Sequence, residues 1–312
     1  DWGISNIMEV LKLMETEPQY KFVIDQIAYF KPFLERYPEL KEQFQDLVNK
    51  GKLEIAGGMY VMPDVNLPSG ESLVRQILVG KKYCQEELGI EVKTGWMIDT
   101  FGHHPQMPQI MKKSGFQSYV FGRVTQENIS EFYWEGIDGS RLLSHWMPLH
   151  YVAFYNSPEY FQGFKEFVET QYEKLKNYAV TDNILALEGA DLNGPASHIP
   201  EMIRQYNQSS EKLVKLKLAT SEEFFEKINN EQNQLPVIKD DFNPLFQGCY
   251  SARIKIKQKN KKLENLFNTS EFLNTISTFL GNKDQQFLID KAWEPVLFNQ
   301  VHDVLCGVET DE

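Results

Sequence analysis

The sequence is poor in cysteine, in basic residues and in long apolar runs, and each scarcity excludes a class of protein. Three cysteines among 312 residues, without a CxxC pair, provide neither a disulfide framework nor a thiolate zinc site. Lys and Arg number 32 against 44 Asp and Glu, and the formal charge of -12 argues against nucleic acid as a partner. No apolar run approaches the roughly 20 residues that cross a bilayer, so we expect no transmembrane segment.

The composition that remains is typical of a folded globular protein. Hydrophobic residues make up 42% and charged residues 24%, so an apolar core can form. The length suits one large domain or two ordinary ones. The chain begins Asp1-Trp2-Gly3 without an initiator Met, which we interpret as the interior of a longer product, and the cysteines identify no compartment.

Short apolar runs alternate with longer amphipathic stretches as far as about residue 230. Because parallel strands need helical crossovers, this alternation predicts an α/β architecture. A predicted β-hairpin, 132–135 with 141–146 around Asp138-Gly139, interrupts it, and we expect this hairpin to be an excursion from the main sheet. The predicted strands are 20–24, 53–56, 94–98, 119–121, 184–187 and 213–218.

The composition changes to Asn, Gln, Asp and Pro at about 230–244, as is typical of a connection between folding units. We therefore predict an α/β domain over 1–235 and the start of a helical bundle over 236–312. Long amphipathic helices are expected at 254–280 and 291–302.

Two predicted strands run into carboxylates. Strand 94–98 is followed by Asp99, and strand 184–187 is followed by Glu188 and Asp191. Active sites of α/β folds lie at the carboxyl ends of strands, so Asp99 and Asp191 could flank one substrate, as glycoside hydrolysis requires. An Asp at a strand end is also a common helix N-cap, which is the structural alternative for each.

Four ordered blocks of the sequence resemble the α-mannosidases of glycoside hydrolase family 38. The blocks are 20–64, 95–103 (Gly-Trp-Met-Ile-Asp-Thr-Phe-Gly-His), 107–116 and 299–303 (Asn-Gln-Val-His-Asp). The resemblance extends to residue 307. It implies a seven-stranded β/α barrel-like catalytic domain, whose first strand would precede residue 1, followed by the start of a helical bundle. It also implies hydrolysis of terminal α-mannosides, in oligosaccharides or glycoconjugates, with one zinc ion.

The resemblance further implies a role for individual residues. Asp99 would be the nucleophile of a retaining mechanism, with Asp191 as general acid/base about 5 to 5.5 Å away. Asp1 would belong to a His-x-Asp pair whose His lies upstream, so a chain without that His should bind zinc weakly. The implied zinc ligands are Asp1, Asp99 and His302. The implied sugar contacts are Phe101, Arg123 and Tyr151, with plain packing as the alternative for Tyr151.

Two other functions compete with this one. A metal-dependent hydrolase of the polysaccharide deacetylase kind would need an HxxxH-like pair, which the sequence lacks. An inactive or truncated fragment that binds sugar, or is only structural, would show affinity without release of product. We expect structural positions for His103 and Asp64.

Overall fold

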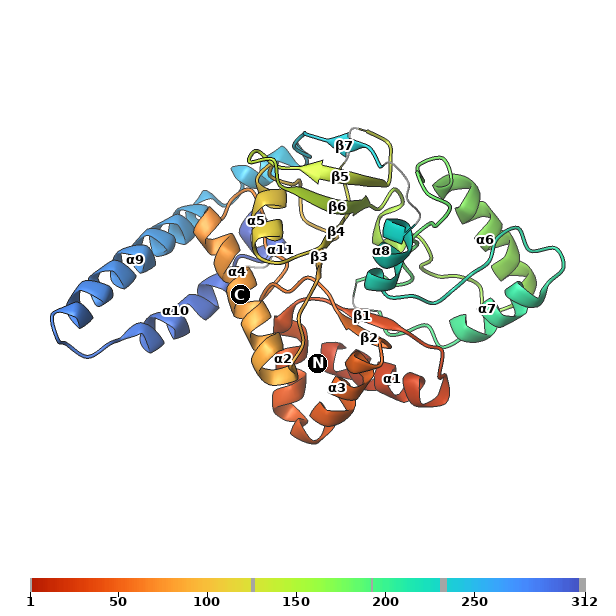
Figure 1. The fold of residues 1–312 in the computed structure, drawn as a ribbon, viewed down its shortest axis with the longest axis horizontal. Helices are drawn as coiled ribbons and strands as arrows, with labels where there is room; N and C mark the ends of the chain where they lie inside the picture. The colour runs from red at the N-terminus through yellow and green to blue at the C-terminus, as the bar shows by residue number, and fades with distance from the viewer. Residues whose placement is uncertain (1, 125–126, 192, 231–234, 309–312) are drawn as a thin grey trace.

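In the part of the chain that the structure describes, the strands form two sheets. A computed structural model, shown in Figure 1, describes residues 2–124, 127–191, 193–230 and 235–308. β1 (Phe22–Ile24) and β2 (Leu53–Ile55) pair in parallel. A second sheet has the order β3-β4-β6-β5-β7, in which only β5 and β6 are antiparallel. Its strands are β3 (Thr94–Met97), β4 (Ser118–Phe121), β5 (Glu131–Glu135), β6 (Arg141–Trp146) and β7 (Val237–Ile238).

A mixed α/β fold is confirmed, but over the described ranges the sheets do not close into a barrel. The predicted strands 184–187 and 213–218 do not form strands there and have no ladder. Other groups take the place of a partner strand. The amide of Asn207 bonds both the N–H and the C=O of Leu216, at 2.9 and 2.8 Å, and Phe154 N–H donates to Leu187 O at 2.9 Å.

The predicted hairpin is present, but the expectation that it is an excursion was wrong. β6 pairs with β5 on one side and in parallel with β4 on the other, so it lies inside the five-stranded sheet. All residues of β6 after Arg141 are buried, which is the pattern of a strand covered on both faces. The alternation of apolar and polar residues predicted the hairpin, but it did not indicate that β6 also pairs with β4.

Helices cover the sheets. The first of them, α1, was not predicted from the sequence. α1 places Ile7, Val10, Leu11 and Met14 in the main core, at helical spacing. A capping box starts α8, where Thr220 and Glu223 exchange side-chain to backbone bonds of 3.2 and 3.3 Å. The helices of this part are α1 (Trp2–Thr16), α2 (Ile27–Arg36), α3 (Lys41–Asn49), α4 (Gly70–Tyr83), α5 (Met107–Lys113), α6 (Phe161–Leu175), α7 (Ile199–Gln208) and α8 (Ser221–Asn230).

The C-terminal part is a helical hairpin that projects from the α/β body (Figure 1). It consists of α9 (Ile254–Phe279) and α10 (Gln286–Phe298), and a short helix α11 (His302–Cys306) follows. The helix predicted at 291–302 is therefore two helices. Between them Asn299 and Gln300 form a turn, and Val301 forms an antiparallel bridge with Pro63. In the described ranges we find no helix with the length and apolarity of a membrane span.

Candidate active site

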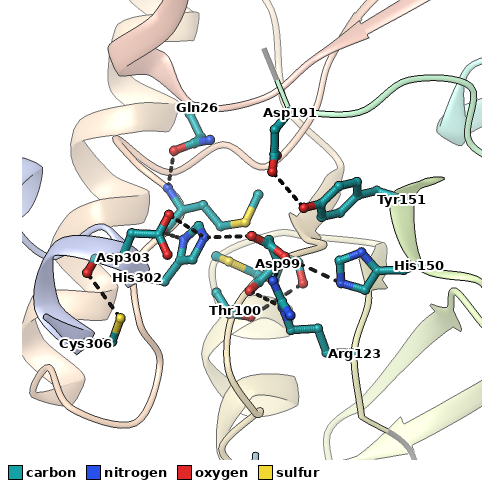
Figure 2. Close-up of polar contacts among 12 residues, drawn as sticks. Gln26, Asp99, Thr100, Arg123, His150, Tyr151, Asp191, His302, Asp303 and Cys306 are labelled. Carbon is teal, nitrogen blue, oxygen red and sulfur yellow. Dashed lines mark hydrogen bonds and ion pairs between the residues drawn. The ribbon is translucent and has the colours of Figure 1, made fainter. Parts of the chain in front are cut away.

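Asp99 lies at the carboxyl end of β3 and is held by three side chains (Figure 2). His302 Nε2 is 3.2 Å from Asp99 Oδ2, and His150 Nε2 is 3.5 Å from Oδ1. Arg123 contacts Oδ1 and donates through Nε to the Asp99 carbonyl at 2.7 Å. Burial acts to raise the pKa of Asp99, but the His302 hydrogen bond and the charge of Arg123 hold it below its ordinary value. Asp99 is therefore an oriented, ionised carboxylate.

His302 is supplied by the far end of the chain and is fixed by one carbonyl. Both its backbone N–H and its Nδ1 reach Met62 O, at 3.1 and 2.9 Å. Because a carbonyl only accepts, Nδ1 carries a proton and Nε2 is the nitrogen that faces Asp99. Burial acts to lower the pKa of His302, but its bonds to Asp99 and Met62 leave it above the ordinary value.

Asp99 and His302 are suited to bind a zinc ion. A carboxylate oxygen and an imidazole nitrogen are both zinc donors, and an Nδ1–H that donates to a carbonyl is the usual way of orienting a zinc-bound histidine. No cluster of three or more His, Cys, Asp or Glu that could hold a metal occurs in the part of the chain that the structure describes. Asp1, the third ligand that the resemblance implies, lies outside that part.

The helix that follows Asp1 reaches the candidate site. A Cβ on Gly3 of α1 would lie 3.5 Å from the ring of Tyr29. Asn6, also on α1, donates to Asn193 O at 3.1 Å, two residues beyond Asp191. The Asn6 bond brings the start of α1 beside the segment that carries Asp191.

Asp191 and Tyr151 lie on the other side of the site. Tyr151 donates its hydroxyl to Asp191 Oδ2 at 2.8 Å, and its ring lies on His150 with the centroids 4.1 Å apart. Since His150 also contacts Asp99, Tyr151 and His150 connect the two carboxylates (Figure 2). Burial and the bond to Asp191 raise the pKa of Tyr151. Tyr151 is thus part of the site and not only of the core.

Two phenylalanines and Arg123 border Asp99 and His302. The Phe101 ring is edge-on to the His302 ring at 5.4 Å, and the Arg123 guanidinium lies 4.8 Å from the Phe101 centroid. Phe246 stands edge-on to Phe101 at 5.4 Å and is 54% exposed. No sequence pattern indicated Phe246, which lies 145 residues from Phe101 in the chain.

Three residues at the site have left-handed backbone conformations. Gln26, Arg123 and His150 have φ values of 59, 68 and 59°, and they follow β1, β4 and β6 respectively. Each such conformation costs a non-glycine residue of order 1–3 kcal/mol and persists only where the surroundings impose it. The site is therefore built from strand ends that hold side chains in fixed, costly positions.

Two further carboxyl groups near the site are partly shielded from solvent. Burial raises the pKa of Asp25, directly after β1, to about 6, and that of Glu188 to about 7.

Asp64 and His103 occupy structural positions. Asp64 accepts the N–H groups of Asn66 and Leu67, both at 2.8 Å, within a turn. His103 is buried in the core, where its Nδ1 is 3.1 Å from the Tyr119 hydroxyl.

Comparison with known proteins finds a family model that matches each of the two parts of the chain. The family model described as "Glycosyl hydrolases family 38 N-terminal domain" matches residues 4–244, and "Alpha mannosidase middle domain" matches residues 244–312. Human alpha-mannosidase 2C1 is 28% identical over 308 residues, which cover 95% of this chain and 29% of the human protein. The alpha-mannosidase of Saccharomyces cerevisiae is 30% identical over 314 residues, which cover 95% of this chain and 28% of the yeast protein.

A solved structure shows a similar fold. The crystal structure of an alpha-mannosidase from Enterococcus faecalis V583 superposes with a TM-score of 0.90 at 26% identity, covering 99% of this chain and 37% of that one. The chain thus spans between a quarter and two fifths of the relatives that it matches.

Proposed function

Because the chain belongs to the glycosyl hydrolases of family 38, we propose that it hydrolyses terminal α-mannosides of oligosaccharides or glycoconjugates. The observation that supports this proposal most strongly is the setting of Asp99. An ionised carboxylate at a strand end lies between His302 and Arg123, and a second carboxylate, Asp191, is connected to it through Tyr151 and His150. Two carboxylates on one site are the groups that glycoside hydrolysis uses. We assign the catalytic domain to 1–235 and the start of the helical domain to 236–312.

We assign a retaining mechanism to this pair. Asp99 attacks the anomeric carbon while Asp191 gives its proton to the glycosidic oxygen, so the C–O bond breaks and the remainder of the substrate leaves as an alcohol. Asp191 then takes a proton from water, whose oxygen attacks the same carbon and releases Asp99. Phe101, Phe246 and Arg123 would border the bound sugar. This assignment requires Asp191 to be protonated in the substrate complex.

We also propose that one zinc ion is held by Asp99, His302 and Asp1. When bound, such an ion would orient sugar hydroxyls next to the reacting carbon. The protein's own contribution is the orientation of the donors. His302 presents Nε2 because Met62 O takes its Nδ1–H, and Arg123 keeps the Asp99 carboxylate from turning away.

Zinc content and hydrolysis should be measured on the same preparation. At its full length, the protein should release the phenol from an aryl α-mannoside and should leave the matching aryl α-glucoside intact. Extraction of zinc by a chelator should lower turnover at least about a hundredfold, and added zinc should restore it, because a bound metal contributes several kcal/mol to such a reaction. Binding of mannosides without any release of phenol would instead support the sugar-binding alternative.

A further inference from the structure

Phe246 combines two features that each cost free energy in the folded protein. Its side chain is 54% exposed, and its backbone is left-handed, with a φ of 47°. A left-handed φ is an outlier for a bulky residue, and such strain is concentrated at active sites and ligand clamps. Among the residues that the structure describes, Phe246 is the only large apolar one with a positive φ. The combination points to a contact with a ligand.

The strained conformation of Phe246 is imposed by the two ends of its segment, which both bond to Asn66. The side-chain amides of Asn66 and Asn243 bond to each other at 3.2 and 3.3 Å. The Asn66 amide also lies 3.3 Å from the Tyr250 hydroxyl oxygen, to which it donates. Phe246 lies between Asn243 and Tyr250 in the chain, so its segment is anchored on both sides. The position of the Phe246 ring is therefore set by the protein before any substrate binds.

A row of rings leads from Asp99 outward to Phe246. The Phe101 ring is edge-on to the ring of His302, which faces Asp99. Phe246 is in turn edge-on to Phe101, with the centroids 5.4 Å apart. The Arg123 guanidinium contacts Asp99 and lies 4.8 Å from the Phe101 centroid and 5.6 Å from that of Phe246. Phe101 is 7% exposed and Phe246 54%, so the row runs from the buried part of the site to its surface.

We propose that Phe246 binds the sugar unit next to the one that is cleaved, and that it thereby selects the leaving group. A terminal mannoside reacts at its last unit, so every other unit belongs to the leaving group. With the last unit at Asp99, the next unit lies at the outer end of the row, where the C–H groups of its ring pack on the exposed phenylalanine. The inference rests on the proposed function, and it makes α-linked oligosaccharides better substrates than mannosides with small leaving groups of equal reactivity.

Two substrates separate this contact from a disturbance of Asp99. In α-mannosyl fluoride the leaving group is a single atom, which does not extend beyond the reacting unit. In an α-linked mannobioside the leaving group is a second sugar. Both should be assayed with the full-length protein. The ratio of kcat/KM for the mannobioside to kcat/KM for the fluoride then reports the contact of the second sugar, because a change at Asp99 affects both substrates.

Three variants should be compared with the wild type. Phe246→Ala removes the ring and should lower the kcat/KM ratio about five- to tenfold, as expected for the loss of one aromatic contact. Phe246→Tyr keeps the ring and should retain most of the wild-type ratio. Phe279→Ala is the matched control, because Phe279 is 90% exposed at the end of α9, and it should leave the ratio unchanged. Phe246→Leu, which keeps apolar bulk beside Phe101, replaces Phe246→Ala if thermal unfolding shows that the latter does not fold.

Binding provides a second readout that needs no turnover. A sulfur-linked mannobioside, which resists hydrolysis, should bind to Phe246→Ala about five- to tenfold more weakly than to the wild type in calorimetry. An unchanged kcat/KM ratio in Phe246→Ala would overturn the inference, and so would an unchanged affinity for this probe. A wild-type protein that binds the probe but cleaves neither substrate would reject the proposed function, while the comparison of affinities would still decide whether Phe246 binds the second sugar.

Discussion

The two sides of the candidate site are built in different ways. Asp99 follows a strand of the five-stranded sheet and is held by His302, Arg123 and His150. Asp191 follows a segment that belongs to no helix or sheet, is exposed, and is held by the Tyr151 hydroxyl. This difference suits the two proposed roles. A nucleophile must meet one carbon in one geometry, whereas an acid/base has to exchange protons with a leaving group and then with water.

The largest effect should come from a change of Asp99, on the side of the site where three side chains contact the carboxylate. Asp99→Asn should lower turnover of an aryl α-mannoside by about a thousandfold or more, because an amide is a poor nucleophile and a poorer zinc ligand. Circular dichroism and thermal unfolding should show an intact fold. Near-normal turnover by the folded variant would reject Asp99 as nucleophile and, with it, the distinction drawn between the two sides.

On the exposed side the loss should depend on the substrate. Asp191→Ala should slow mannosides with poor leaving groups by about 10²- to 10⁴-fold and activated aryl mannosides far less, because only the former need a proton from the enzyme. Azide should restore part of the rate by attacking the glycosyl-enzyme without a base. If both substrate types slow equally and azide has no effect, the role belongs to another carboxyl group, such as Glu188.

A smaller change tests how Asp191 is held. Tyr151→Phe keeps a ring against His150 and removes the hydroxyl that donates to Asp191. One such hydrogen bond is worth about 0.5–1.5 kcal/mol, so kcat should fall by up to about tenfold. The loss should be confined to substrates with poor leaving groups. An equal loss on activated substrates would show that Tyr151 supports the attack by Asp99 and not the proton transfer by Asp191.

The last effect is on stability and not on turnover, and it concerns the pH dependence at Glu188, on the segment that leads to Asp191. Burial raises the pKa of Glu188 from 4.5 to about 7, so the folded state holds this proton more tightly than the unfolded state does. The free energy of unfolding should therefore fall as pH rises from about 4.5 to 7. Glu188→Gln should flatten that fall and leave the protein about 2 to 3 kcal/mol more stable than wild type at pH 8.

Denaturant unfolding at several pH values measures this directly, and Glu211→Gln serves as the control. Glu211 is exposed, and its hydrogen bond to Lys165 lowers its pKa, so its removal should not flatten the fall. The same pH dependence in Glu188→Gln as in wild type would show that the segment before Asp191 does not shield Glu188.

Local signals in the sequence predicted single strands and turns better than they predicted which segments bond to one another. The Asp138-Gly139 hairpin was predicted correctly, because its signal lies within a few residues of the two strands that it joins. The strands expected at 184–187 and 213–218 were wrong. An apolar run indicates an extended chain but not a hydrogen-bonding neighbour, and the Asn207 side chain bonds Leu216 instead.

The candidate site shows the same limit. Asp99 and His302 could be named because their neighbours in the sequence resemble a known family. Their setting could not be predicted, since Met62 lies 240 residues from His302 and Phe246 reaches Phe101 from the helical part. Gln26 likewise accepts the N–H of Met62, which is 36 residues away. Such long-range contacts depend on the folded sheets and leave no pattern in the chain.

The most direct test of the central claim is to trap the residue that bonds the sugar. A fluorinated mannosyl fluoride, in which fluorine on the ring slows both steps and a good leaving group favours the first, should accumulate a glycosyl-enzyme. Mass spectrometry of the digested protein should find one mannosyl group on the peptide that contains Asp99, and none in Asp99→Asn. A label on Asp191 or Glu188, or unlabelled protein that releases mannose of inverted configuration, would contradict the account.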